Sequence, residues 1–383
     1  MKLLMVSHYF ESHRSGIELI AGRLVRELAL LGQEMVWAAI KVTPPPVFGG
    51  VGCRAVPLRG INITERYLGI PFPIPTPGAI RQIRREVRRA DAVLLQDSLY
   101  PVCIAAFVFA RFCGKPVVIA QHVGIVPYRN PVFRLLMQLA NRIVVRPMLA
   151  RADRIAFFSE VTAAYFAGID FRSRPALMFT GVDSDVYYPV RVNRKLECRR
   201  DFGLDPDQPV VLFVGRFVEK KGLHILSRMA RIRPDITWVF AGWGHLNPAD
   251  WALQNVVVFS DLVGASLAAL YQASDLLVLP SKGEGFPLVI QEALACGLPV
   301  VCSADTARAD PAASQFLSTV ELDEQRPDAT ALAFCEEVAR ALEGRGNAGA
   351  PSQDRFRFVS ERYCWQATAA RYFEVIRSAL AEG

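Results

Sequence analysis

The stretch LLVLPSKGEGFPLVIQEALACGLPVVCS, Leu276–Ser303, has the pattern of a strand, a helix and a second strand in close succession. Pro287 suits a first helical position because its fixed φ and missing N–H cost nothing there, and Gly297 is typical of a helix C-terminus. A chain that runs from strand to helix to strand builds a parallel sheet. The glycine-rich loop Lys282–Phe286 is therefore expected at the carboxyl end of a strand, where such sheets bind ligands.

The same alternation continues along the whole chain. The first half has strand-like apolar runs at 2–7, 34–40, 91–96, 115–122 and 153–159, separated by helical patterns at 16–32, 79–90, 101–114 and 131–152. The second half has strand-like runs at 210–215, 236–242, 256–260, 276–281 and 299–303, with helical patterns at 222–232, 267–274 and 287–297. This order predicts an α/β protein with helices on both faces of parallel sheets.

The alternation is interrupted once, between Asp183 and Pro209, where charged residues and prolines gather. We therefore expect three parts: a doubly wound domain over 1–189, a second over 190–360, and an amphipathic C-terminal helix over 361–383 that can pack back on the first domain. Two such domains facing each other would enclose a deep cleft, lined by the carboxyl ends of their strands.

Composition narrows the class of protein. A chain of 383 residues with 52% hydrophobic and 21% charged residues is globular and long enough for two cores. No apolar run approaches the roughly 18 residues that a membrane span needs, and the N-terminus lacks a signal-peptide pattern. The eight scattered cysteines form no Cys-x-x-Cys pair, which is typical of reduced thiols and excludes a zinc or disulfide framework. These features predict a cytoplasmic protein.

Charge is divided unevenly between the two halves. Residues 1–190 carry 23 Lys and Arg against 13 Asp and Glu, a net +10, whereas residues 191–383 carry 21 against 24, a net −3. Much of the excess lies in the helical pattern 79–90, which contains Arg81, Arg84, Arg85, Arg88 and Arg89. The basic half is expected to meet something acidic. We expect an anionic membrane surface, since each basic residue there contributes about 1 kcal/mol; a solvated helix is the simpler alternative.

The loop and helix of the opening stretch can hold a phosphorylated sugar. The amides of Gly285–Val289 lie at a helix N-terminus, which favours a phosphate group. Glu284 and Glu292 would repel a phosphate, so we expect them to face sugar hydroxyls instead. The alternative is that Glu284 caps the helix and Glu292 is a solvated surface charge.

A second motif, VGRFVEKKG at Val214–Gly222, follows the first strand of the second domain. Arg216 would stand at the strand's carboxyl end and Lys221 at the start of the next helix. Two cations converging there can neutralise a diphosphate. Taken alone, the motif is equally compatible with ordinary loop charges.

Together these segments resemble glycosyltransferase family 4, retaining enzymes of the GT-B fold with two Rossmann-like domains and an interdomain cleft. The likeness is strongest in GRFVEKKG and in the Glu-x7-Glu stretch EGFPLVIQE followed by ALACGLPVV. Weaker similarities are SGIELIAGRLVREL, ADRIAFFSE, TGVDSDVYYP, AGWGH and LYQASDLLVLPS.

The resemblance implies roles for particular residues. The implied catalytic residues are Arg216, Lys221, Glu284 and His122, and the implied donor-binding residues are Gly16, Gly215, Gly285, Phe286, Pro287, Leu288, Val289 and Glu292. Arg216 and Lys221 would hold the diphosphate in place of a metal, Glu284 would contact the donor sugar and Glu292 the ribose. His122 would reach the transferred sugar or the acceptor. The implied partners are a nucleotide-diphosphate-sugar donor and a glycan or lipid-linked acceptor, with no cofactor.

The sequence departs from the family pattern in several places. Ser15 and Gly16 stand where paired glycines are usual, and Thr180 replaces an asparagine. Pro287 stands where a glycine is common. Gln96 and Asp97 replace histidines that often follow the third strand, which puts the acceptor side in doubt more than the donor side.

Other functions remain to be weighed. A nicotinamide-dependent dehydrogenase is disfavoured because no Gly-x-Gly-x-x-Gly turn follows the first strand. Basic and aromatic residues are not interleaved as nucleic-acid binding requires. Asp183-Ser184-Asp185 spells a metal-binding Asp-x-Asp, but it lies at the domain junction and is interpreted as structural. A nucleotide-sugar epimerase of the same architecture and a non-catalytic nucleotide-sugar-binding subunit stay as alternatives.

Overall fold

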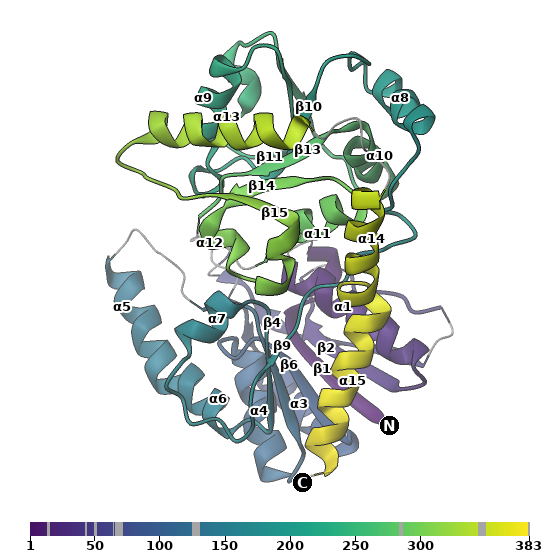
Figure 1. The fold of residues 1–383 in the computed structure, drawn as a ribbon. Coiled ribbons are helices and arrows are strands. Elements are labelled where there is room, and N and C mark those ends of the chain that lie inside the picture. The colour runs from purple at the N-terminus through teal and green to yellow at the C-terminus, as the bar shows by residue number, and fades with distance from the viewer. Residues whose placement is uncertain are drawn as a thin grey trace. The chain divides into compact units, whose positions relative to one another are not determined.

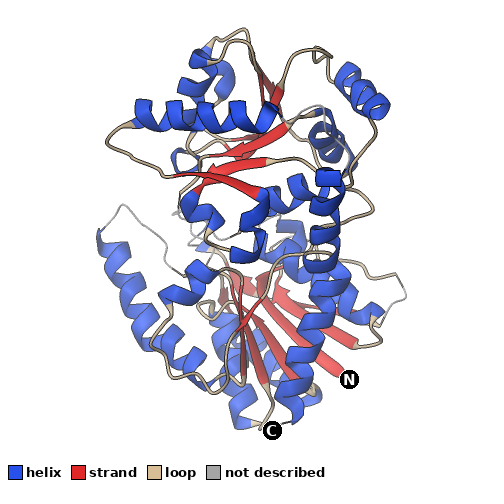
Figure 2. Ribbon diagram, viewed as in Figure 1, coloured by secondary structure: helices blue, strands red, loops and turns tan. Residues whose placement is uncertain are grey.

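The computed structural model of the chain describes residues 1–13, 16–42, 44–49, 52–63, 65, 72–124, 131–282, 286–343 and 350–381. The chain forms two compact units (Figures 1 and 2). The first contains Met1–Gly181 together with Trp365–Gly383, and the second contains Val182–Cys364. The boundary between the units therefore lies at Val182, before the expected Pro189. At this boundary the Val182 N–H donates to the Tyr363 carbonyl (2.5 Å), and Val182 forms an isolated β-bridge with Cys364.

The first unit is built on a seven-stranded parallel sheet in the order β3-β2-β1-β6-β7-β8-β9. Its strands are β1 (Lys2–Tyr9), β2 (Glu34–Ile40), β3 (Cys53–Leu58), β6 (Ala92–Gln96), β7 (Val117–Gln121), β8 (Arg154–Phe157) and β9 (Ala176–Leu177), with β4 (Gly60–Ile61) and β5 (Ile74–Pro75) forming a separate antiparallel pair. The strand order reverses between β1 and β6, so the ligand-binding edge of this unit is expected at their carboxyl ends.

Helices cover both faces of this sheet (Figure 2). One apolar cluster joins the sheet to α3 (Pro77–Arg89), α4 (Pro101–Phe112) and α6 (Arg146–Arg151). The other joins it to α1 (Gly16–Leu30) and α15 (Trp365–Ala381), whose Tyr372 and Ile376 are fully buried. Alternate strand residues face the two layers, Leu4 one and Met5 the other, as the 2-residue period of a strand requires. The C-terminal helix therefore belongs to the core of the first unit.

The helix expected over 131–152 is divided into three. α5 (Pro131–Ala140) is followed by a π-helical turn (Asn141–Val145) and then by α6, with α7 (Glu160–Tyr165) further along the chain. In the π turn the Arg146 N–H donates to the Asn141 carbonyl, one residue further back than in an α-helix. The wider turn comes just before Pro147, which has no N–H to continue the α-helical ladder.

The second unit has a six-stranded parallel sheet in the order β12-β11-β10-β13-β14-β15. Its strands are β10 (Val210–Arg216), β11 (Thr237–Trp243), β12 (Val256–Phe259), β13 (Leu276–Leu279), β14 (Val300–Ser303) and β15 (Leu317–Val320). Its α-helices are α8 (Val192–Asp201), α9 (Leu223–Ile232), α10 (Ala265–Ala273), α11 (Leu288–Ala295), α12 (Ala304–Ala307), α13 (Pro327–Glu343) and α14 (Ala350–Arg362). The order reverses between β10 and β13, the two strands that lead into the motifs singled out above.

A buried ion pair lies at the amino ends of the strands of the second sheet. The guanidinium of Arg199, 2% exposed, donates to the Asp275 carboxylate (2.6 Å) and to the Ala273 carbonyl (2.9 Å). Lys195 Nζ lies 2.6 Å from the same carboxylate. Burial by itself would raise the pKa of Asp275, but the two cations outweigh it and hold that pKa below its ordinary value. Asp275 is therefore charged in the folded protein.

Substituting Asp275→Ala leaves the Arg199 guanidinium buried without a counter-charge and is expected to lower the free energy of unfolding by about 3–5 kcal/mol. Because the native pKa of Asp275 is depressed, its contribution is complete above the unfolded pKa, about 4, and is lost as the pH falls through the native pKa. Denaturant titration between pH 3 and pH 8 measures both. Asp328→Ala, which breaks an exposed pair with Arg228, is the control and should leave stability nearly unchanged.

Candidate active site

The candidate site of the second unit is formed by two loops that the fold brings into direct contact. Gly222 has a left-handed backbone (φ 75°), and a Cβ added there would lie 2.1 Å from the Pro280 carbonyl oxygen. The Lys282 N–H donates to the Lys220 carbonyl (2.9 Å). The GRFVEKKG loop after β10 is therefore packed against the loop after β13, and only glycine permits the approach at position 222.

The two expected diphosphate-binding cations stand in the first of these loops. Arg216 is the last residue of β10 and is exposed, and Lys221 ends a short 3-10 turn (Glu219–Lys221). A Cβ on Gly215 would lie 3.8 Å from Lys221 Nζ, so the ammonium group is held over the strand end. Gly215, Arg216 and Lys221 thus gather at the point where the strand order reverses.

The neighbouring strand supports this arrangement through two further glycines. A Cβ on Gly242 would lie 1.9 Å from the Gly215 carbonyl oxygen, and one on Gly244 would lie 2.3 Å from the Phe217 carbonyl oxygen. The Phe217 N–H donates to the carbonyl of Trp243 (2.7 Å), whose side chain is 67% exposed. The AGWGH segment therefore packs closely against the loop that carries Arg216 and is hydrogen-bonded to it.

The loop after β13 leads into α11, which begins at Leu288. The Ser281 carbonyl accepts a hydrogen bond from Ser303 Oγ (2.6 Å), and the buried ring of Phe286 packs on Tyr363 with centroids 5.5 Å apart. Pro287 is the N-cap residue, with extended ψ (141°), so its placement as the first helical residue was wrong by one position. Glu284 and Gly285 lie outside the described residues, and their roles stay predictions.

Glu292 lies inside α11 and is buried, not a solvated surface charge. It is 7% exposed, and Tyr271 Oη donates to its carboxylate (2.8 Å). The Tyr187 hydroxyl bonds to the same carboxyl group. Burial raises the pKa of Glu292 to about 7, although the two tyrosine hydroxyls act to lower it. This carboxyl group can therefore titrate near neutral pH.

In the first unit, His122 follows β7 and is held on two sides. Its Nε2 lies 2.8 Å from Gln96 Oε1, and its ring stacks on Phe158 with centroids 3.9 Å apart. Gln96 Nε2 donates to Met5 Sδ (3.0 Å), so its amide oxygen is the acceptor for the histidine N–H. Burial lowers the pKa of His122 to about 3. The imidazole is therefore neutral, with Nδ1 as an acceptor.

The residues that replace the usual histidines have structural partners. Asp97 is 2% exposed, has φ 74°, and accepts hydrogen bonds from the N–H groups of Ser98 (2.8 Å) and Val123 (3.2 Å). Gln121 Nε2 donates to the same carboxylate (3.1 Å). Asp97 thus ties the loop after β6 to the loop after β7, while Gln96 orients His122.

A further polar pair near the end of β1 was not anticipated. His8 Nε2 lies 2.6 Å from the Glu18 carboxylate, both side chains are at most 2% exposed, and the His8 ring stacks on Tyr100 at 3.7 Å. The available signal was a histidine at a strand end with a glutamate in the first turn of the following helix.

Gly16 begins that helix, and a Cβ there would meet nothing within 4 Å. The first unit therefore does not itself require glycine at position 16.

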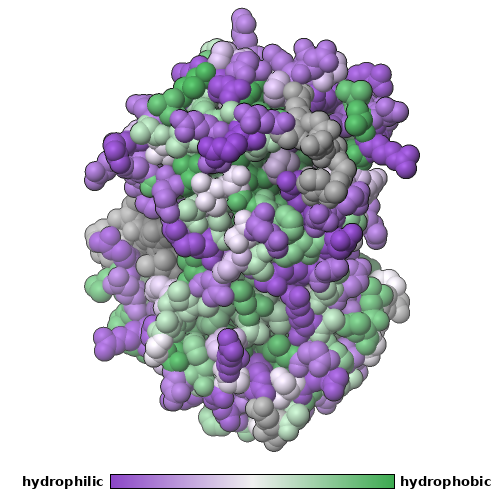
Figure 3. Space-filling model, in the orientation of Figure 1, coloured by the Kyte–Doolittle hydropathy of each residue, from purple (hydrophilic) through white to green (hydrophobic). Residues whose placement is uncertain are grey.

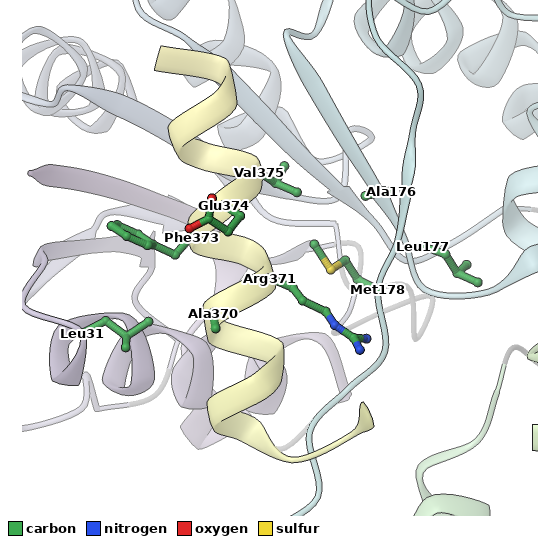
Figure 4. A pocket seen from close by; sticks show the side chains of 9 residues that line it. All are labelled: Leu31, Ala176, Leu177, Met178, Ala370, Arg371, Phe373, Glu374 and Val375. Carbon is green, nitrogen blue, oxygen red and sulfur yellow. The ribbon is translucent and has the colours of Figure 1, made fainter. Parts of the chain in front are cut away.

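Two further features are a cavity in the first unit and the turn at Asp183–Asp185. A cavity of about 470 Å³ in the first unit lies beside α15 and β9, with Leu31 and Phe373 among its mainly apolar lining (Figure 4). The Asp185 N–H donates to Asp183 Oδ1 (3.2 Å), so this pair forms a local turn. Within the described part of the chain, no group of three or more His, Cys, Asp or Glu residues is arranged to hold a metal ion.

Parallel sheets of six and seven strands, each with one reversal of strand order, define an α/β protein of two Rossmann-like units. Residues 14–186 match the family model "Glycosyltransferase Family 4" and residues 208–333 match "Glycosyl transferases group 1". A protein of Bacillus subtilis strain 168, described as the teichuronic acid biosynthesis glycosyltransferase TuaC, is 30% identical over 79% of this chain and 81% of its own. The chain belongs to glycosyltransferase family 4.

Other relatives match over a shorter stretch. The D-inositol 3-phosphate glycosyltransferase of Mycobacterium sp. strain KMS is 35% identical over 40% of this chain, and the match spans only 37% of that protein. Among solved structures, sucrose-phosphate synthase from Thermosynechococcus elongatus has a TM-score of 0.73 at 18% identity, with all of both chains covered. Anabaena HepE in complex with UDP also has a TM-score of 0.73, at 16% identity, with 99% and 100% covered. These likenesses confirm the predicted GT-B fold.

Substituting Gly222→Ala is expected to separate the two loops, because the new Cβ would collide with the Pro280 carbonyl. The matched control is Gly203→Ala in the same unit, where φ is also left-handed (66°) but nothing lies within 4 Å. The control should show only the backbone cost, about 1–2 kcal/mol. Gly222→Ala should lose more stability and should also weaken nucleoside-diphosphate binding. Calorimetry of folding and of binding checks both; equal effects of the two variants would contradict the role given to this contact.

Proposed function

We propose that the protein is a retaining, metal-independent hexosyltransferase that moves a sugar from a nucleotide-diphosphate-sugar to a hydroxyl group of a glycan or lipid-linked acceptor. The observation that carries the proposal is the packing of the Arg216–Lys221 loop against the loop leading into α11 at the reversal point of the second sheet. Two cations there are suited to a diphosphate, and Glu292 lies on the helix that follows.

Each residue of the proposed site has a separate role in the reaction. The bond from the sugar C1 to the diphosphate oxygen breaks, a bond from C1 to the acceptor oxygen forms on the same face, and the acceptor proton passes to the departing phosphate. Negative charge grows on that phosphate, so Arg216, Lys221 and the backbone N–H groups between Gly285 and Val289, apart from Pro287, which has none, would stabilise the transition state more than the ground state. Glu284 would hold the donor sugar and Glu292 the ribose, with Gly16 leaving room for the donor.

The neutral state of His122 fits a binding role on the acceptor side. With Nε2–H engaged by Gln96, its Nδ1 can accept a hydrogen bond from a hydroxyl group of the sugar or the acceptor. A pKa of about 3 keeps the ring uncharged through the physiological range. UDP-sugars are the first donors to test, because a structural relative, HepE, is described in complex with UDP and glucose. Product analysis without acceptor separates transfer from the epimerase alternative.

Arg216→Ala and Lys221→Ala should each reduce turnover about 10²–10³-fold at saturating donor, since each removes a charge aimed at the leaving diphosphate. The wild-type enzyme should keep its full rate in excess chelator. Arg231→Ala is the control, because it removes an exposed cation from α9 in the same unit. Near-normal turnover in either loop variant would overturn the site assignment, and a loss in chelator that magnesium or manganese restores would overturn metal independence.

We also propose that the first unit docks on an anionic membrane surface, where a lipid-linked acceptor would be presented. On α3, Ile83 and Val87 are buried in the apolar cluster beside the sheet. Its five arginines at 81, 84, 85, 88 and 89 are exposed, and Glu86, at 2% exposure, is paired with Arg54 (2.6 Å). Glu86 also pairs with Arg85 (3.7 Å), so this one carboxylate offsets only a small part of the charge of the five arginines.

Apolar side chains are also exposed on α4, on α5 and in the π turn of the same unit. They are Phe112 (85%), Leu135 (67%), Leu136 (56%), Leu139 (51%) and Ile143 (61%). Figure 3 shows apolar side chains reaching the surface between hydrophilic ones. No described helix is both long and apolar enough to cross a bilayer. Exposed apolar groups and exposed cations on one unit are the two kinds of side chain that a membrane interface binds.

Sedimentation with anionic vesicles tests this docking. The wild type should bind at low salt and dissociate at high salt, because surface charges are screened. Changing Arg84, Arg85, Arg88 and Arg89 to Gln should abolish binding. Changing Arg228, Arg231, Arg326 and Arg340 of the second unit to Gln removes the same charge and should not. Absence of binding by the wild type, or binding that ignores both salt and the α3 substitutions, would leave a soluble acceptor as the better interpretation.

A further inference from the structure

The carboxyl group of Glu292 is held by two tyrosines from different elements. Tyr271 belongs to α10, is fully buried and donates its hydroxyl to Glu292 Oε2 (2.8 Å). Tyr187 belongs to the segment at the start of the second unit, is 7% exposed and bonds to the same carboxyl. The two rings meet edge to face, with centroids 5.9 Å apart. The carboxyl orientation is therefore set from outside its own helix.

The tyrosine segment is itself fastened to the same helices. Gln272 of α10 donates its amide N–H to the Tyr188 carbonyl (3.2 Å), and the Tyr188 backbone also bonds to the Cys296 thiol at the end of α11. Tyr187 thus has little freedom to turn away from Glu292. Two buried tyrosine hydroxyls therefore meet one carboxyl group, and the segment of Tyr187 is hydrogen-bonded to the helix that carries Tyr271.

The chemistry of a carboxylate leaves room for a ligand. An ionised carboxylate has about four acceptor positions, and two hydroxyl donors fill only part of them. Burial favours the protonated form and raises the pKa of Glu292 to about 7, whereas both tyrosine hydroxyls stabilise the ionised form. The titratable groups that face it are Tyr187, Tyr271 and the Cys296 thiol, whose own pKa rises through burial and through Glu292.

We propose that Tyr187 and Tyr271 are positioning residues for the donor: their hydroxyls hold Glu292 ionised and oriented to accept hydrogen bonds from the ribose hydroxyls of the nucleoside diphosphate. This rests on the proposed function, in which Glu292 meets the ribose. Neither tyrosine needs to touch the ligand. Removing either hydroxyl leaves the ring packing in place but lets the carboxyl group rotate or take up a proton.

The test compares two ligands on the full chain: the nucleoside diphosphate that the wild type binds best, and its 2′,3′-dideoxy analogue. Tyr271→Phe and Tyr187→Phe should each weaken binding of the first ligand about tenfold. Binding of the dideoxy ligand should be unchanged, because it has no ribose hydroxyls for Glu292 to hold. A purely structural loss would weaken both ligands equally.

The pH profile is a second readout. Wild-type affinity for the nucleoside diphosphate should weaken as the pH falls through about 7, since a protonated Glu292 loses acceptor capacity. Each Phe variant removes a group that lowers this pKa, so the midpoint should move to higher pH. In a Glu292→Gln background, Tyr271→Phe should have no further effect on affinity, because the carboxyl group through which it acts is gone.

Tyr363→Phe is the matched control. Tyr363 is also buried in the second unit and donates its hydroxyl to a carboxylate, that of Asp310. It should lower thermal stability while leaving the affinity ratio of the two ligands and the pH midpoint unchanged. Equal losses for both ligands in the Tyr187 and Tyr271 variants, or an unmoved pH midpoint, would overturn the inference while the wild type still binds nucleoside diphosphate. Failure of the wild type to bind any nucleoside diphosphate would overturn the proposed function as well.

Discussion

The second unit depends on one close backbone contact, between Gly222 and the carbonyl of Pro280. Two strands that lie side by side at a reversal point send their helices to opposite faces of the sheet, and their loops diverge unless something joins them. The left-handed glycine lets the chain turn against the neighbouring strand end, and the Lys282–Lys220 backbone hydrogen bond completes the junction. Arg216, Lys221 and the start of α11 owe their common location to this contact.

In the same unit, the pKa values of two buried carboxyl groups are shifted in opposite directions. Asp275 is paired with two cations, and its pKa falls; Glu292 has only neutral hydroxyl partners, and its pKa rises to about 7. Both carboxyls are removed from water, so the sign of the shift is decided by the partner. The first stabilises the amino ends of the strands as a charged group, whereas the second can titrate near neutral pH.

In the first unit, polar side chains at the strand ends are engaged with one another. Gln96 orients His122, Asp97 closes two loops, and His8 pairs with Glu18. Gln96 and Asp97, two of the residues that depart from the family pattern, thus have hydrogen-bonded partners, and burial keeps His122 neutral.

The sequence by itself determined the α/β class and the two-domain organisation, because hydrophobic period and glycine placement are local signals. It also predicted a functional site in the Arg216 and Glu292 segments. It could not decide whether Glu292 was a surface charge, nor find its tyrosine partners, since Tyr187 and Tyr271 are distant in sequence and converge only through packing. It also missed the π turn before Pro147, the His8–Glu18 pair and the division of the chain at Val182. The division at Val182 depends on contacts with Tyr363 and Cys364, far away in the chain, and the His8–Glu18 pair depends on how α1 packs on β1, so only the tertiary structure supplies them.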